Sequence, residues 1–424
     1  MTQTQSRPSH TYGSHRHPAW LFSAFALGYF FSAMLRAVTA TLAPQFSQEL
    51  SLSAADLGLL AGVFFAGFAC TQLPLGSALD RLGPKRVLMA MMLLAVAASV
   101  AFAMASSFQG LLLARALMGV GLSASLMAAL TAFRYAFGPA AQLRASSWML
   151  MTGSLGMLAS TLPVHALLPL VGWRGLFWCT AAALLLSICF LACIVPRDEQ
   201  RPAAPPSQQA SGQEGLQDAG YGVIFRHPRF VRYMPMGFWH YGGLIAVQTL
   251  WAGPWMTRVA GYSAAESARG LFIINLCMLC SFALLGWIVP RFSAWGWETE
   301  RLVRWASPLS CLLMLLLIVM GAQAGQGLLA VWCMSCVIIS LSQPRVGQAF
   351  ASHLVGRALS AYNLGIFLGV FCMQWGLGLV IDAFSGMGWP TEQAFRGAFS
   401  VYLTGAVACW LWFIWKKERP VAAL

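Results

Sequence analysis

About twelve apolar runs, each long enough to form a membrane-spanning helix, constrain the fold of this chain more than any other feature. A helix needs about 20 mainly apolar residues to cross a hydrocarbon core of about 30 Å. Only 9% of the 424 residues are charged, whereas about 25% are charged in a soluble domain. The expected spans are residues 19–43, 55–77, 86–105, 109–133, 145–168, 175–195, 232–254, 268–289, 303–321, 327–349, 357–382 and 395–415.

Helices are the predicted form of these spans, because backbone polar groups in lipid are satisfied only in helices or closed barrels. The alternating pattern typical of barrel strands does not occur in the sequence. We therefore predict an all-α integral membrane protein. The Lys and Arg residues that give the net charge of +13 are then expected to set the membrane topology. We expect no nucleic-acid partner.

The distribution of Lys and Arg predicts the orientation. Positive residues gather in cytoplasmic loops, and cytoplasmic termini leave only Arg174, Arg258, Arg269 and Arg396 outside. We expect a multi-pass protein of the cell inner (plasma) membrane, with both termini in the cytoplasm.

The hydropathy pattern divides the chain into two halves. Residues 196–226, rich in Pro, Ser, Gln and Gly, are expected to form a flexible cytoplasmic linker. Parts of the two halves recur at a nearly constant offset, as in Gly76…Arg81 and Gly286…Arg291. The expected organisation is a cytoplasmic tail at 1–18, a six-helix bundle at 19–195, the linker at 196–226, a second six-helix bundle at 227–415 and a tail at 416–424.

The loop between the second and third spans carries the most specific motif. It resembles the signature G-x-x-x-D-R-x-G-x-[KR]-[KR] of the major facilitator superfamily, a family of secondary transporters. The matching residues are Gly76, Asp80, Arg81, Gly83, Lys85 and Arg86. Arg115, followed by Gly119 and Gly121, resembles a second pattern of the family, R-x-x-x-G-x-G.

The resemblance implies twelve transmembrane helices in two pseudo-symmetric bundles, with a central substrate cavity and alternating access. In the family the acidic residue of the loop faces the positive end of a helix in the other half. We therefore assign the matched loop residues and Arg115 to gating. The alternative is that the basic loop only sets topology. The expected branch is bacterial and similar to transporters of organic anions or nitrate.

Two Arg residues within predicted spans are candidates for anion binding. Arg36 lies well inside the first span and Arg345 follows Pro344 in the tenth. Charges inside a membrane usually line cavities or form pairs, and a guanidinium binds carboxylate or phosphate through two hydrogen bonds. No acidic residue lies in the middle of a span, which favours an anionic cargo over a cationic one. A structural role for both Arg residues remains the alternative.

Other polar or aromatic residues of the spans could contact a substrate. We include His165 and His240 because imidazole titrates near neutrality and could carry a proton. Each of these residues could equally serve as a hydrogen-bonding contact between helices. The full set is Tyr29, Gln72, His165, His240, Gln248, Trp251, Asn275, Tyr362, Asn363 and Gln374. We expect Trp255 instead to anchor its helix at the membrane interface.

The favoured function is secondary active transport of a small organic or inorganic anion, coupled to protons or to a counter-anion, by a monomer in the lipid bilayer. The alternatives are a neutral nutrient or copper as cargo, or a sensor that has lost transport. The fifth span lacks the G-x-x-x-G-P-x-x-G-G pattern of drug/proton antiporters, which disfavours multidrug export. We expect no enzyme activity, no cofactor and no metal site. The sequence contains no P-loop motif, so we do not expect transport to be driven directly by ATP.

Overall fold

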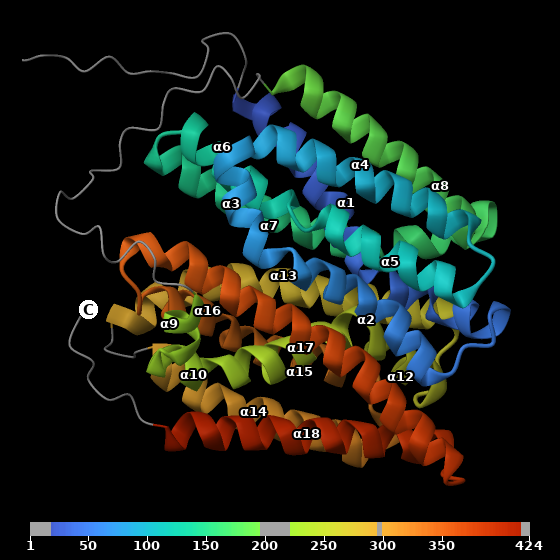
Figure 1. Ribbon diagram of the computed structural model, residues 1–424. Helices are drawn as coiled ribbons and strands as arrows, with labels where there is room; N and C mark the ends of the chain where they lie inside the picture. Colours follow the sequence, from blue (N-terminus) through green and yellow to red (C-terminus); the bar gives the residue numbers. More distant parts are fainter. Residues whose placement is uncertain (1–17, 196–220, 295–298, 417–424) are drawn as a thin grey trace, which may run out of the picture.

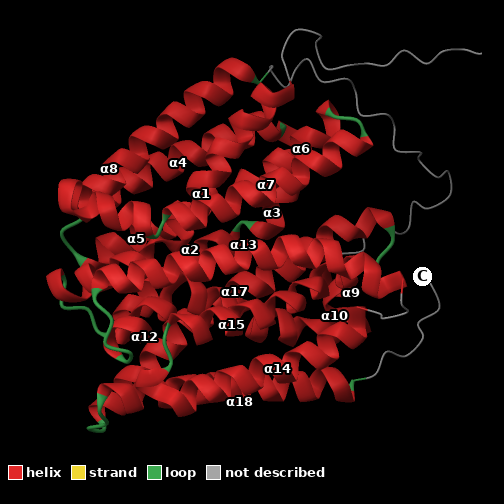
Figure 2. Cartoon of the chain, turned by 180° about the vertical axis from the view of Figure 1, so that it is seen from behind, coloured by secondary structure: helices red, strands yellow, loops and turns green. Residues whose placement is uncertain are grey.

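The computed structural model describes residues 18–195, 221–294 and 299–416, and every regular element in these segments is a helix. Figure 1 shows most helices of the first half above those of the second half, and Figure 2 shows the same helices from behind. The predicted all-α class is confirmed. The division into two bundles remains a prediction, and residues 196–220 of the expected linker lie outside the described segments.

In the first half, helices are interrupted within several of the predicted spans. The bend between α2 and α3 is 48°, and α8 is kinked at Gly172, whose φ of 66° is non-helical. The first turns of α8 therefore continue the fifth span, and the rest forms the sixth. The helices are α1 (Pro18–Glu49), α2 (Ala54–Cys70), α3 (Gln72–Leu82), α4 (Pro84–Met104), α5 (Phe108–Leu122), α6 (Ser125–Ala136), α7 (Pro139–Ala159) and α8 (Leu162–Ile194).

In the second half, the run from α10 to α12 is one helical path that contains two π-helical stretches, and α15 continues through a 3₁₀ stretch into α16. Residues 221–226, expected in the linker, form α9. The elements are α9 (Tyr221–Arg226), α10 (Pro228–Pro235), η2 (Met236–Tyr241), α11 (Gly242–Ala246), η3 (Val247–Trp251), α12 (Ala252–Arg258), α13 (Ala264–Ala294), α14 (Thr299–Met320), η4 (Gly321–Gln323), α15 (Gln326–Cys336), η5 (Val337–Leu341), α16 (Ser342–Gly347), α17 (Ser352–Gly386) and α18 (Thr391–Trp415).

Nine helices of the described segments are long and apolar enough to cross a membrane, or ten if α2 and α3 form one bent span. Two further expected spans, 145–168 and 232–254, correspond to α7 with the start of α8 and to the divided run from α10 to α12. The chain is therefore a multi-span membrane protein.

A repeat that the sequence analysis missed lies at the start of α2 and α13. Ser53 and Asp56 form a capping box, in which each side chain accepts the other's backbone N–H. Ser263 and Glu266 form the same box, at the sequence offset that relates Gly76 to Gly286. A capping box satisfies two of the backbone donors that every helix start leaves free.

The two halves meet along an antiparallel seam between α2 and α17. The Phe68 ring packs against Phe367 in a tilted arrangement, with 4.5 Å between the ring centroids. Towards the start of α2, a Cβ at Gly58 would collide with the carbonyl oxygen of Gln374, and a Cβ at Gly378 with that of Ala54. These glycines let the two backbones approach closely, as small residues do between membrane helices.

Candidate substrate site between the two halves

Arg36 of α1 lies in a cluster of aromatic side chains at the interface between the halves. Its guanidinium carbon is 5.4 Å from the centroid of the Phe68 ring, within the range of a cation–π contact. Tyr241 of η2 interacts electrostatically with both Arg36 and Tyr29, and the ring of Phe367 in α17 packs against that of Phe68. We call these five side chains the Arg36 site. They come from both halves of the chain.

The guanidinium of Arg36 is incompletely satisfied. Its Nε is buried and has no hydrogen-bond partner, and no carboxylate of the described residues forms an ion pair with it. A buried donor without a partner is costly. Arg36 is therefore a positive group without an acidic partner among the described residues, and its role in anion binding remains a prediction.

The walls of the site depend on the helices behind them. Tyr29 is held against α7, where a Cβ at Gly153 would lie 2.5 Å from a ring carbon of Tyr29. Tyr241 ends the π-helical stretch η2. A π-helix inserts an extra residue into a turn and often marks a functional position.

The residue before Tyr241 points elsewhere. His240 is buried, and its Nε2 lies 2.8 Å from the carbonyl oxygen of Ala406 in α18. Its neighbour Trp239 donates a hydrogen bond to the carbonyl of Tyr402 in the same helix. The structure thus places His240 in a helix–helix contact within the second half. His165, the other candidate relay, is half-buried in the first turns of α8.

Arg345 does not join Arg36. It lies in α16, near the start of α17, where its Nη1 is 3.5 Å from Oε1 of Gln348. It also interacts electrostatically with Glu300, whose carboxylate forms an ion pair of 2.6 Å with Arg232. The two Arg residues that the sequence analysis grouped therefore occupy separate environments.

Apart from Gln72, the remaining polar candidates form two hydrogen-bonded groups in the second half. In the first, Gln248 donates to Asn275 at 2.9 Å, while Gln374 donates to Thr249 at 3.0 Å and accepts at its backbone carbonyl from the indole of Trp251. These bonds join η3 to α13 and α17. Hydrogen bonds between membrane helices hold them together.

In the second group, the Tyr362 hydroxyl donates to Ser342 at 2.7 Å and Gln343 donates to Asn363 at 2.8 Å. These bonds connect α16 to α17. Gln72 belongs to neither group, because its amide bonds the Phe68 carbonyl in the preceding turn at 3.2 Å. Most of the expected contact residues are thus already partnered by neighbouring helices.

The expectation that Trp255 anchors its helix at the membrane interface is wrong. Its side chain is fully buried, packs on Phe399 with a centroid distance of 4.9 Å, and donates to the Ala324 carbonyl at 2.9 Å. Helix α12 runs through Gly253 and Pro254 to Arg258 and keeps the indole in the interior.

The loop motif is built mainly within the first half. Lys85 donates to the carbonyls of Ala192, at 2.9 Å, and Val195. It thereby satisfies carbonyls that the end of α8 leaves free, which also suits the negative end of the helix. Gly83 has a φ of 85°, a backbone conformation that favours glycine. A Cβ at Gly76 would meet nothing within 4 Å.

The acidic residue of the motif is exposed in this conformation. No hydrogen bond or ion pair joins Asp80 to any described residue, and Arg81 is exposed beside it. A gating contact to the other half is therefore not formed by the part of the chain that the structure describes. The gating role of these residues remains a prediction.

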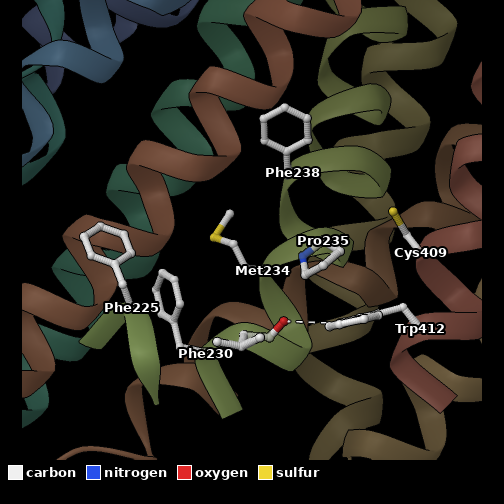
Figure 3. Close-up of a pocket in the computed structure, with 8 residues that line it drawn as sticks. Phe225, Phe230, Met234, Pro235, Phe238, Cys409 and Trp412 are labelled. Carbon is white, nitrogen blue, oxygen red and sulfur yellow. Dashed lines mark hydrogen bonds between the residues drawn. The ribbon is translucent and has the colours of Figure 1, made fainter. Parts of the chain in front are cut away.

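A cavity of about 500 Å³ is lined by none of the five side chains of the Arg36 site. Figure 3 shows Phe225 and Phe230 beside Met234 on one side, and Cys409 and Trp412 of α18 on the other. Its lining is almost wholly apolar, and it includes none of the residues expected to bind substrate.

The sequence profile described as Major Facilitator Superfamily matches residues 25–344. The chain belongs to this superfamily. Multidrug resistance protein MdtM of Salmonella typhimurium strain LT2 is 29% identical over 227 residues, which is 49% of this chain and 52% of that protein. Multidrug resistance protein MdtL of Escherichia coli strain SMS-3-5 is 29% identical over 164 residues, 38% of this chain and 41% of that protein. The chain thus matches about half of these relatives' length.

Solved structures of similar shape cover nearly the whole chain. A bacterial homologue of the human lysosomal transporter Spinster, in an inward-facing and unoccupied conformation, has a TM-score of 0.79 at 17% identity, and covers 96% of this chain and 100% of that one. A D-xylose–proton symporter has a TM-score of 0.75 at 14% identity, and the match covers 94% of this chain and 97% of that one. At these identities the likeness shows the fold alone. The expected similarity to the organic-anion and nitrate branches gains no support from these proteins.

Within this major facilitator fold, Arg115 connects helices of the first half. Its side chain is buried, and one nitrogen donates to the Leu35 carbonyl at 2.8 Å and to Thr39 at 2.7 Å. The guanidinium carbon is 4.9 Å from the centroid of the Phe64 ring. Arg115 therefore holds α5 against α1, the helix that carries Arg36. Its predicted part in gating would act through that helix.

Proposed function

We propose that this protein is a secondary transporter that moves a small organic anion across the membrane by alternating access. The observation that carries the proposal is Arg36, a guanidinium with a buried, unpartnered nitrogen at the interface between the halves. A transported anion would complete its hydrogen bonds through two parallel contacts. Membership in the superfamily favours transport rather than catalysis.

The chemistry of the walls favours an organic anion with an apolar or aromatic part. Phe68 lies against the cation, Phe367 packs behind Phe68, and Tyr241 interacts with both Arg36 and Tyr29. Aromatic rings offer large apolar surfaces, and tyrosine adds a hydroxyl that can hydrogen-bond. A bare inorganic anion such as nitrate would leave most of this surface unused.

The orientation in the membrane is part of the proposal. We place both termini in the cytoplasm of the inner membrane, which makes the start of α2 the outer end and the loop with Asp80 the inner end. In this orientation the exposed Asp80 fits an inward-facing conformation, the one described for the Spinster homologue. A monomer with a six-helix bundle on each side of Arg36 is sufficient for the cycle.

A second candidate is drug transport, because the bacterial relatives are named multidrug resistance proteins. The aromatic walls of the Arg36 site favour it. The positive charge of Arg36 argues against it for cationic drugs, because a site that binds cations needs acidic residues. A neutral nutrient, copper, or a sensor role would make no use of the positive charge of Arg36 at the interface between the halves.

Ligand-induced thermal stabilisation of the purified protein tests the proposal. Aromatic and aliphatic carboxylates, organic phosphates, nitrate, neutral nutrients, cationic drugs and copper would each be added to the native protein, to Arg36→Gln and to the matched control Arg345→Gln. A ligand at 100 times its Kd adds about 2.7 kcal/mol if it binds only the folded state.

We expect an organic anion to stabilise the native protein and Arg345→Gln but not Arg36→Gln. Equal stabilisation of all three proteins by an anion would exclude Arg36 as its binding group. Stabilisation by cationic drugs alone would favour the second candidate.

A further inference from the structure

The start of α2 is completed by a carboxylate from the other half of the chain. Asp382, near the end of α17, accepts the backbone N–H of Ala54 at 3.0 Å and that of Ala55 at 2.7 Å, one on each carboxylate oxygen. Ser53 and Asp56 bond each other's backbone N–H in the capping box. All four N–H groups from residue 53 to 56 are therefore satisfied, two of them only by Asp382.

A second contact crosses between the halves at the same end. Arg258, the last residue of α12, donates to the hydroxyl of Ser47 in α1 at 2.8 Å. Burial lowers the pKa of the Arg258 guanidinium, and the charge of Asp382 opposes that shift. Arg258 and Asp382, both of the second half, therefore also interact with each other. Each reaches from the second half to the first.

Among the described residues, the corresponding position of the repeat has no such contact. The capping box at the start of α13 repeats that of α2, but Ala264 and Ala265 are exposed. No carboxylate is recorded on their N–H groups within the described segments. The contact is therefore a property of the α2–α17 pair, and helix capping alone does not require it.

We propose that Asp382 is an outer latch, a residue that holds the α2 and α17 ends together while the outer side is closed and releases them when it opens. An anion at a helix start is favoured by the helix dipole, and a hydrogen bond to a charged group is stronger than a neutral one. Separation of the halves would expose two N–H groups and the carboxylate to water, so the contact exists in one state only. A contact with that property biases the equilibrium between the states.

The latch complements the loop motif. Asp80 lies in the first half at the inner end of the α2–α3 segment, and Asp382 lies in the second half at the outer end of α17. The same pair of segments thus carries one carboxylate at each end, and only Asp382 is engaged in this conformation. The inference is independent of which solute the protein carries.

Hydrogen-exchange mass spectrometry on the full-length protein tests the latch with Asp382→Asn. We expect amide exchange in residues 44–58 and at the end of α17 to quicken about tenfold, while exchange in the loop at residues 76–90 slows because the inner end closes. The matched control is Glu392→Gln. Glu392 also accepts a backbone N–H, from Ala322 at 3.2 Å, but both groups belong to the second half.

The outcomes separate a latch from a local cap. Faster exchange confined to the first turn of α2, with the inner loop unchanged, would overturn the proposal, as would the same response in Glu392→Gln. If Asp382→Asn does not fold, Arg258→Gln removes the neighbouring contact to Ser47 and should shift both ends in the same directions. Failure of either folded variant to shift the inner loop would also reject the latch.

Discussion

Gly253 provides a test of whether the two halves separate at the outer end. It lies in α12 of the second half, and a Cβ there would be 2.7 Å from the carbonyl oxygen of Ala40 in α1. Ordinary contact begins at 3.4 Å, so Gly253→Ala forces α1 and α12 apart by about 0.7 Å. Overpacking of this kind costs about 1–3 kcal/mol. If the halves can rock apart, the strain disappears in the open state, and the equilibrium shifts about 5–150-fold towards it.

Gly121 is the matched control, because the same substitution produces the same clash inside one half. A Cβ at Gly121 would be 2.7 Å from the carbonyl oxygen of Met91 and 2.6 Å from the nitrogen of Ala95, both in α4. The strain there cannot be relieved by rocking. Gly376→Ala corrects for the higher helix propensity of alanine, since a Cβ at Gly376 meets nothing within 4 Å.

Thermal unfolding and hydrogen exchange distinguish the three variants. Relative to Gly376→Ala, we expect Gly121→Ala to lower the melting temperature while leaving the exchange pattern intact. Gly253→Ala should instead quicken exchange at the outer ends of α1 and α12 with a smaller loss of melting temperature. If Gly253→Ala behaves like Gly121→Ala in both assays, the interface is rigid and the reasoning is refuted.

Three further substitutions test single contacts. Arg115→Met removes two charge-assisted hydrogen bonds, each worth about 1.5–3 kcal/mol, and should lower the melting temperature by several degrees; an unchanged value would show that Arg115 does not hold α1. Lys85→Met should quicken amide exchange at the end of α8, because the carbonyls of Ala192 and Val195 lose their donor, and unchanged exchange would contradict that contact. Gly153→Ala should weaken anion binding with little change in stability by displacing the Tyr29 ring, and unaltered affinity in a titration would remove Tyr29 from the site.

The all-helical fold could be predicted from the sequence because membrane spans are constrained by length and apolarity. The loop motif identified the family for a related reason: charged residues at fixed spacing are conspicuous in an apolar chain. The break at Gly172 was expected as a loop between spans 145–168 and 175–195, and only its positive φ shows how α8 turns there. The π-helical stretches η2 and η3 leave no mark in hydropathy.

Only some residues of the candidate site could be chosen from the sequence, because composition does not show which face of a helix meets the cavity. Arg36 was found as a charge with no acidic partner. Tyr241 was missed although its neighbour His240 was chosen, since one residue of helical rotation separates the two environments. Phe68 and Phe367 were missed because an aromatic residue in an apolar helix looks like an ordinary core residue.

The contacts between the two halves could not be predicted from the sequence either. Asp382 lies at the end of a predicted span, where an acidic residue is unremarkable, and its partners are backbone N–H groups that any residue carries. The repeated capping boxes of α2 and α13 were visible as Ser53-Ala54-Ala55-Asp56 and its counterpart beginning at Ser263. A repeat search that ignored hydropathy would have found them.

Counterflow in proteoliposomes tests the central claim most directly. Vesicles preloaded with the organic anion that stabilises the protein would be diluted into a trace of the same labelled anion, with native protein, Arg36→Gln or Arg345→Gln in the membrane. We predict transient accumulation of label, saturable by unlabelled anion, with native protein and Arg345→Gln, and none with Arg36→Gln. Equal accumulation with Arg36→Gln, or no flux of an anion that binds the native protein, would contradict the account.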